Sequence, residues 1–153
     1  MRKSMAALIA LAVLAAGGAA WAAGSNTLTV NASVTGTCKF SSATSTLSFG
    51  ALDPSSAADG TGSTTTNFWC TKGVNTDAIT NDSGLNFSGK NRMKDAVSGE
   101  FIPYTLALLK DGLANSGPGA PRTLTISGTV LNADYTGKSA GNYADTVILS
   151  INP

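Results

Sequence analysis

The side chains with the most chemistry to offer are two cysteines, Cys38 and Cys70, in a chain of 153 residues. A redox pair or a metal site would need C-x-x-C spacing or further ligands, and these cysteines have neither. In an exported chain, two cysteines most simply form one disulfide. Closing a loop of that length should stabilise the fold by ~3–4 kcal/mol if the bond acts through the entropy of the unfolded chain. We therefore predict a structural Cys38–Cys70 disulfide and no metal site.

Catalytic side chains are scarce in the rest of the chain. It contains no histidine, so Ser-His-Asp and Cys-His catalysis and the usual zinc sites are excluded. The acidic pairs Asp77/Asp82 and Asp95/Glu100 fall in turn-rich segments, whereas a glycosidase needs two carboxylates on rigid elements that face one cleft. The sequence therefore favours a protein that is not an enzyme and uses no cofactor.

The N-terminus has the pattern of a secretory signal peptide. Arg2 and Lys3 form its positive start, residues 5–16 are continuously apolar, and a run of small residues ends at Ala22. The apolar run is shorter than the about 20 residues that cross a bilayer. We therefore predict a signal peptide over residues 1–22, export to the periplasm, and no stable insertion in the membrane.

Charge is low and scattered once this peptide is removed. Eight basic and nine acidic residues remain, a net charge of −1. No basic patch is present that could bind a phosphate backbone, so nucleic acid is not an expected partner. The most charged segment, residues 88–99, contains Lys90, Arg92, Lys94 and Asp95. We interpret it as a solvated loop or an edge strand, with a binding patch as the alternative.

The elements that would position any site are short β-strands. The chain is rich in Thr, Ser, Gly, Asn and Val, and no long 3.6-residue periodicity is present. About seven strands separated by turn residues predict a two-sheet Greek-key sandwich. Tyr143 either bonds nearby backbone at a corner of this sandwich or packs as an ordinary aromatic. The predicted strands cover residues 27–34, 46–50, 64–71, 85–87, 101–109, 122–131 and 143–152.

The first of these strands has no hairpin partner beside it. Its apolar residues occupy every second position, so they share one face of an extended chain while Thr, Asn and Ser form the other face. The question is whose sheet this strand completes. If it pairs with the sheet of a neighbouring molecule, the protein is a polymer subunit. The four apolar residues are Leu28, Val30, Ala32 and Val34.

Several short motifs follow this strand in a characteristic order. With them the sequence resembles the spore coat protein U family, which includes subunits of archaic, Csu-type chaperone–usher pili, and the likeness covers nearly all of the mature chain. The motifs are Val34-Thr35-Gly36-Thr37-Cys38, Leu47-Ser48-Phe49-Gly50, Cys70-Thr71-Lys72-Gly73, Arg92-Met93, Pro103-Tyr104-Thr105-Leu106 and Ala140-Gly141-Asn142-Tyr143-Ala144-Asp145-Thr146-Val147.

The resemblance implies an incomplete immunoglobulin-like Greek-key β-sandwich that lacks its final strand and is completed by donor-strand complementation. A periplasmic chaperone would fill the open groove first, and the N-terminal strand of the next subunit would replace it at an outer-membrane usher. Residues 23–35 would be the donor segment, with Leu28, Val30, Ala32 and Val34 as its donor side chains. Residues 36–153 would be the domain, with Val147, Leu149 and Ile151 on its acceptor groove. One departure is the C-terminus, because the family commonly ends in an aromatic residue and this chain ends in Pro153.

The function that follows is a structural subunit of a secreted surface fibre that polymerises by donor-strand exchange and serves adhesion or biofilm formation. Its neighbours in the fibre would be copies of itself or related subunits. The alternative is a self-complete secreted β-sandwich coat protein, in which residues 27–34 pair within their own domain. An enzyme acting on a surface polymer is the weakest possibility.

Overall fold

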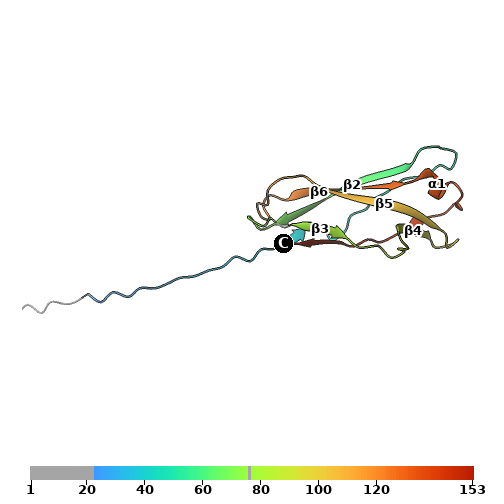
Figure 1. Cartoon of the computed structure of the whole chain (residues 1–153). Coiled ribbons are helices and arrows are strands. Elements are labelled where there is room, and N and C mark those ends of the chain that lie inside the picture. The colour runs from blue at the N-terminus through green and yellow to red at the C-terminus, as the bar shows by residue number, and fades with distance from the viewer. Residues whose placement is uncertain (1–22, 76) are drawn as a thin grey trace, which may run out of the picture. The chain divides into compact units, whose positions relative to one another are not determined.

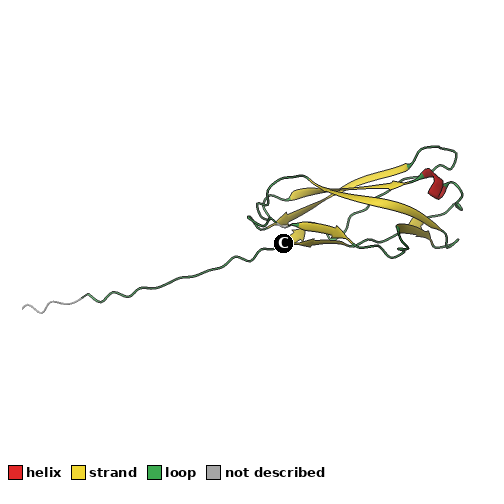
Figure 2. Cartoon of the chain, in the orientation of Figure 1, coloured by secondary structure: helices red, strands yellow, loops and turns green. Residues whose placement is uncertain are grey.

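The computed structural model describes residues 23–75 and 77–153, so the predicted signal peptide over residues 1–22 lies outside the described residues. Figures 1 and 2 show that strands dominate this part of the chain, with one short helix. The elements are β1 (Cys38–Phe40), β2 (Gly60–Cys70), β3 (Ala78–Asn81), β4 (Asn91–Asp95), β5 (Phe101–Lys110), β6 (Arg122–Val130), α1 (Asn132–Tyr135), β7 (Tyr143–Ala144) and β8 (Leu149–Asn152). No helix among the described residues is long and apolar enough to cross a membrane.

The compact unit begins at Val34 and continues to the C-terminus. Every strand pair of the described residues joins elements within it. The prediction of a strand over residues 27–34 is wrong for this isolated chain, since residues 23–37 contain no strand. A period-2 pattern identifies residues suited to a sheet, but a strand forms only where another chain segment supplies hydrogen bonds.

Two antiparallel sheets make up the compact unit, which confirms the predicted all-β class. The larger sheet has the order β1-β2-β6-β5-β4-β7, and β3 pairs with β8 in the smaller one. In Figure 1, β2, β6 and β5 lie in one layer, while β3 and β4 lie in the other. The larger sheet therefore curls from one layer into the other, and β7 and β8 lie beside β4 and β3 in that second layer.

The longest strands lie where sequence alternation is strongest. The strands predicted at residues 101–109 and 122–131 correspond closely to β5 and β6, and the strand predicted at residues 64–71 begins earlier, as β2 at Gly60. The strand predicted at residues 143–152 is divided into β7 and β8. The segment at residues 88–99 contains β4, which has neighbours on both sides and is therefore not an edge strand.

Two of the other predicted strands are wrong. Residues 85–87 lie in a loop, and the strands on either side of it, β3 and β4, take the sheet positions instead. Residues 46–50 form no strand, because this segment crosses the inner face of the larger sheet over the paired glycines Gly62 and Gly128. A Cβ atom at Gly62 would collide with the backbone oxygen of Ser48, and one at Gly128 would lie 2.8 Å from the Phe49 ring. The two glycines therefore make room for this crossing.

The hydrophobic core consists of two clusters. The first lies next to the disulfide and contains Phe68, Cys70, Leu124 and Ile126, with Leu149 and Ile151 packed against it. The second contains Ile102, Tyr104, Val130 and Tyr135, with Val147 and Phe49 packed against it. Leu106 packs against both clusters.

A corner near the start of β7 is closed by Tyr143. Its hydroxyl donates to the backbone oxygen of Ser139, four residues upstream, at 2.9 Å. The sequence left open whether this tyrosine bonds nearby backbone or only packs, and the structure shows the backbone bond. The hydroxyl oxygen of Tyr143 also lies 3.3 Å from a carboxylate oxygen of Glu100.

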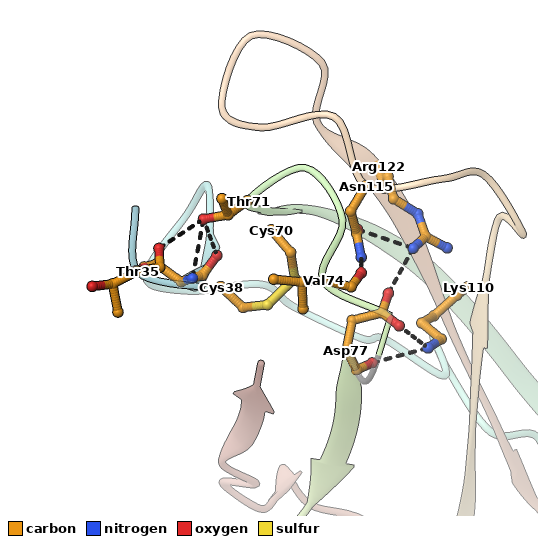
Figure 3. Close-up of a disulfide and its surroundings, with 10 residues drawn as sticks. Thr35, Cys38, Cys70, Thr71, Val74, Asp77, Lys110, Asn115 and Arg122 are labelled. Carbon is orange, nitrogen blue, oxygen red and sulfur yellow. Dashed lines mark hydrogen bonds and ion pairs between the residues drawn. A yellow bond between two sulfur atoms is a disulfide. The ribbon is translucent and has the colours of Figure 1, made fainter. Parts of the chain in front are cut away.

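A buried ionic network lies close to the disulfide (Figure 3). Asp77 accepts from Arg122 at 2.6 Å and from Lys110 at 2.9 Å, and Arg122 also donates to Asp111 at 3.0 Å. The amide of Asn115 joins the network through its oxygen, which accepts from Arg122 at 3.1 Å. Burial raises the pKa of Asp77, but the bonds and charges of Lys110 and Arg122 outweigh it and hold the pKa below its usual value.

This network predicts a loss of stability in acid. Because the pKa of Asp77 is depressed in the folded protein, its contribution is fully present above the unfolded pKa of about 3.9 and is lost as the pH falls through the lower folded value. The free energy of unfolding should therefore decrease below about pH 4. Denaturant titrations across this range test the prediction, and Asp77→Asn should flatten the dependence. An unchanged pH profile in that variant would contradict it.

Candidate functional site: an open groove beside β8

An open groove of about 580 Å³ lies between the two layers of the compact unit. One wall is formed by residues 143–149 and the other by residues 42–47. Its floor comes from the larger sheet, where β2, β5 and β6 contribute Thr64, Thr66, Leu106 and Ile126. The groove thus runs where a further strand would fit, between β8 and the segment that crosses over Gly62.

The backbone of β8 is paired on one edge only. Thr80 pairs with Ser150 and Ala78 with Asn152, and the N–H of Asp82 donates to the oxygen of Ile148 at 3.0 Å. In an antiparallel ladder alternate residues bond the same neighbour, so Ile148, Ser150 and Asn152 bond toward β3. The backbone groups of the residues between them point toward the opposite edge, where the described strands offer no partner.

The predicted acceptor residues occupy this edge. Val147, Leu149 and Ile151 are half-buried and alternate with the exposed Ile148, Ser150 and Asn152. Val147 and Leu149 line the groove. Ile151 instead packs against the cluster beside the disulfide, past the end of the groove lining.

The middle of the groove wall formed by residues 143–149 is a loop and not a strand. Residues 145–148 lie between β7 and β8 and belong to neither. Asp82 accepts from the N–H of Ile148 at 2.9 Å, and Asp145 accepts from the N–H of Leu85 at 3.0 Å. The hydroxyl of Tyr104, on β5, donates to the other oxygen of Asp145 at 2.7 Å.

The predicted donor side chains are exposed. Leu28, Val30 and Val34 retain 81%, 80% and 85% of their accessible surface, and Ala32 is exposed as well. Residues 28–34 span seven positions, as do residues 143–149 of the groove wall. Three large apolar side chains on one face of a short segment are thus exposed to water.

The chain enters the compact unit at the disulfide. Cys38 and Cys70 are bonded to each other, as the sequence predicts, and they face each other in the register of β1 and β2. Thr71 binds the residues just before this bond: its hydroxyl accepts from the N–H of Thr37 at 3.0 Å, and its own N–H donates to the oxygen of Thr37 at 2.8 Å. Figure 3 shows these contacts, together with that between Thr71 and Thr35. The contacts of Thr71 thus bind the first residues of the compact unit, beside the disulfide.

Sequence reasoning did not identify the groove floor or the Tyr104–Asp145 contact. Tyr104 is only 6% exposed, and burial, followed by the bond to Asp145, raises the pKa of its hydroxyl well above the usual value. The hydroxyl therefore remains a proton donor throughout the neutral range. Both residues stand in motifs that the sequence singled out, but the motifs themselves do not indicate that they meet.

Comparison with known proteins identifies a domain family. The family model of the Spore Coat Protein U domain matches residues 25–150. No curated protein matches the chain. Among solved structures, a chain is similar in the crystal structure of the CsuC–CsuE chaperone–tip adhesion subunit pre-assembly complex from archaic chaperone-usher Csu pili of Acinetobacter baumannii. That likeness has 18% identity and a TM-score of 0.48, and it covers 77% of this chain and 40% of the other chain.

Proposed function

The chain belongs to the Spore Coat Protein U domain family, and from this premise we propose that it is a structural subunit of a chaperone–usher surface fibre. In this proposal the segment at residues 23–35 of one copy fills the groove beside β8 of the next copy. The observation that carries the proposal is the unpaired edge of β8, which begins at Leu149 beside an open groove whose floor includes Leu106 and Ile126.

The free edge supports the addition of a strand. Unpaired N–H and C=O groups on a strand edge bind an extended segment through main-chain hydrogen bonds, while alternate side chains enter pockets and set specificity. The incoming segment would place Leu28, Val30 and Ala32 above a floor that includes Leu106 and Ile126. Because Leu106 already packs against both core clusters, a strand in the groove would join them into one core.

The geometry of the compact unit favours polymers over closed pairs. The donor segment joins the domain beside the disulfide, and Ile151, near the C-terminal end of β8, packs against the core cluster that contains Cys70. A donor that arrives from another copy and pairs antiparallel to β8 must connect to its own domain at the opposite end of the groove. Each subunit would then receive at one end and donate at the other, and such a head-to-tail contact does not close.

An open apolar groove also explains the expected partners. An exposed slot with a free strand edge is an aggregation hazard, so an exported subunit needs a periplasmic chaperone to cover it before assembly. An outer-membrane usher would then exchange the chaperone for the next subunit, and the fibre would reach the cell surface. Adhesion or biofilm formation is the role that we propose for that fibre.

Fusing a second donor segment to the C-terminus tests the proposal. β8 ends at Asn152, so a short flexible linker after Pro153 followed by a copy of residues 24–35 would allow the copy to run back antiparallel along β8. Burial of Leu and Val side chains at roughly 1.5–3 kcal/mol each should raise the melting temperature by about 10 °C or more. The fused chain should also be monomeric, because its groove is already filled at high effective concentration.

The matched control is the same fusion with Val30→Asp in the appended copy only. This control should melt as the unfused chain does and should still form multimers. Equal melting temperatures for the two fusions would contradict the proposed use of the groove.

A further inference from the structure

We infer that Tyr104 and Asp145 are positioning residues that hold the wall of the groove ready for the incoming strand. This inference rests on the proposed function, because it concerns how the same groove takes up a strand of a second copy. Neither residue was predicted to belong to the site. The observation behind it is that the part of the wall nearest the centre of the groove lacks a strand ladder of its own.

The interruption of the wall has a visible cause. β3 ends at Asn81 and β4 begins at Asn91, so the chain that pairs with β8 and β7 leaves the sheet between them as a loop. Residues 145–148 therefore have no continuous strand beside them on that side. On the other side lies the groove. A segment bounded by a loop and an open slot needs other contacts to stay extended.

Two backbone bonds hold this segment, from the N–H of Asp82 to the oxygen of Ile148 at 3.0 Å and from the N–H of Leu85 to the oxygen of Thr146 at 3.2 Å, and two carboxylates add further contacts. The side-chain carboxylate of Asp82 accepts from the N–H groups of Ile148 at 2.9 Å and Gly84 at 3.0 Å. In a regular strand pair, the backbone oxygen of Asp82 would accept the bond from Ile148. Asp145 accepts from the N–H of Leu85 at 3.0 Å and from the side-chain amide of Asn86 at 3.1 Å. Gly84 has a φ of +69°, and a Cβ atom there would collide with the carboxylate of Asp145. The loop is thus shaped around Asp145.

The Tyr104 contact differs from these because it crosses the sandwich. Tyr104 lies on β5, in the sheet that forms the groove floor. Its hydroxyl donates to Asp145, in the wall formed by residues 143–149, at 2.7 Å. Its ring packs in the second core cluster, 6.0 Å from the ring of Phe49. A short bond from this fixed ring to a carboxylate is charge-assisted and therefore strong. It holds the wall at a set distance from the floor while the groove is empty.

Loss of this bond should act on strand uptake more than on the fold. A wall that moves would be ready for a strand only part of the time, and the apparent rate and affinity of uptake decrease by that fraction. Hydrogen bonds to charged groups contribute enough for about a tenfold change. Tyr104→Phe and Asp145→Asn should therefore each slow strand uptake about tenfold.

The experiment measures uptake of a fluorescent synthetic peptide of residues 24–35 by the full chain purified from the periplasm, using fluorescence anisotropy. Tyr135→Phe is the matched control. Tyr135 is 4% exposed, lies in the same core cluster, and donates its hydroxyl to the oxygen of Ala58 at 2.7 Å, away from the groove. Tyr104→Phe and Tyr135→Phe should lose similar thermal stability, and only Tyr104→Phe should take up the peptide slowly.

The outcomes separate the two proposals. Uptake by the wild type, with about tenfold slower uptake in Tyr104→Phe and Asp145→Asn, supports the positioning role. Uptake at the wild-type rate in both variants would overturn the positioning role alone, and so would equal slowing in Tyr135→Phe. Failure of the wild-type chain to take up the peptide at all would overturn the proposed function itself.

Discussion

Replacing Val30 by aspartate should abolish the multimers of this protein. Val30 is exposed and lies in the middle of the apolar face of the donor segment. In the groove it would lie over a floor that includes Leu106 and Ile126, and burying an unpaired carboxylate there costs several kcal/mol. A loss of about 3 kcal/mol already weakens association by more than about a hundredfold. Material sheared from the cell surface and run unboiled on a denaturing gel should change from a ladder to a single monomer band.

The neighbouring residue provides the control for this variant. Asn31→Asp adds the same charge one position away, on the polar face of the segment, which a strand in the groove turns to solvent. The Asn31→Asp chain should still form the ladder of multimers. Loss of the ladder in both variants would indicate an effect of charge on export or solubility. An intact ladder in Val30→Asp would show that the apolar face of this segment is not the donor surface.

Leu149→Asp changes the groove instead of the donor segment, and it should also abolish the gel ladder of multimers. Leu149 lines the groove and packs against the core cluster beside the disulfide. An aspartate there would place a charge on the wall that the incoming strand must cover, at a cost of several kcal/mol. Ser150→Asp is the matched control, since Ser150 is exposed and its backbone bonds toward β3. The same unboiled gel should show monomers for Leu149→Asp and a ladder for Ser150→Asp.

Folding of the Leu149→Asp chain is verified separately. Its far-UV circular dichroism and its resistance to periplasmic proteases should match those of Ser150→Asp. A folded Leu149→Asp chain that still forms the ladder would show that the groove does not accept the strand.

Alternation in the sequence predicts strands where the partner lies in the same chain. β5 and β6 alternate clearly and pair with each other, so their positions follow from the pattern. The same pattern at residues 27–34 forms no strand, because no described segment of the chain pairs with it. At residues 46–50, Leu47 and Phe49 do turn inward, as alternation requires, but the segment crosses the sheet over Gly62 and Gly128 and does not join it.

The site was predictable in its apolar part only. Period-2 alternation places Val147 and Leu149 on one face of the last predicted strand, and the family resemblance implies that this face lines the groove. Tyr104 and Asp145 are 41 residues apart, and their contact depends on how β5 and the end of β7 are brought together across the sandwich. The break between β7 and β8 depends on the loop at residues 82–90, in which local turn residues compete with the ladder. No single-sequence pattern encodes either long-range arrangement.

Mixing the two groove variants tests the central claim most directly. A Val30→Asp chain cannot donate its segment but has an intact groove, and a Leu149→Asp chain cannot accept a segment but has an intact donor. Neither should form multimers alone. Mixed together and run unboiled on a denaturing gel, they should form a dimer and nothing longer, because one intact donor meets one intact groove. A mixture that stays monomeric, or one that forms a ladder, would contradict strand donation from one copy to the next.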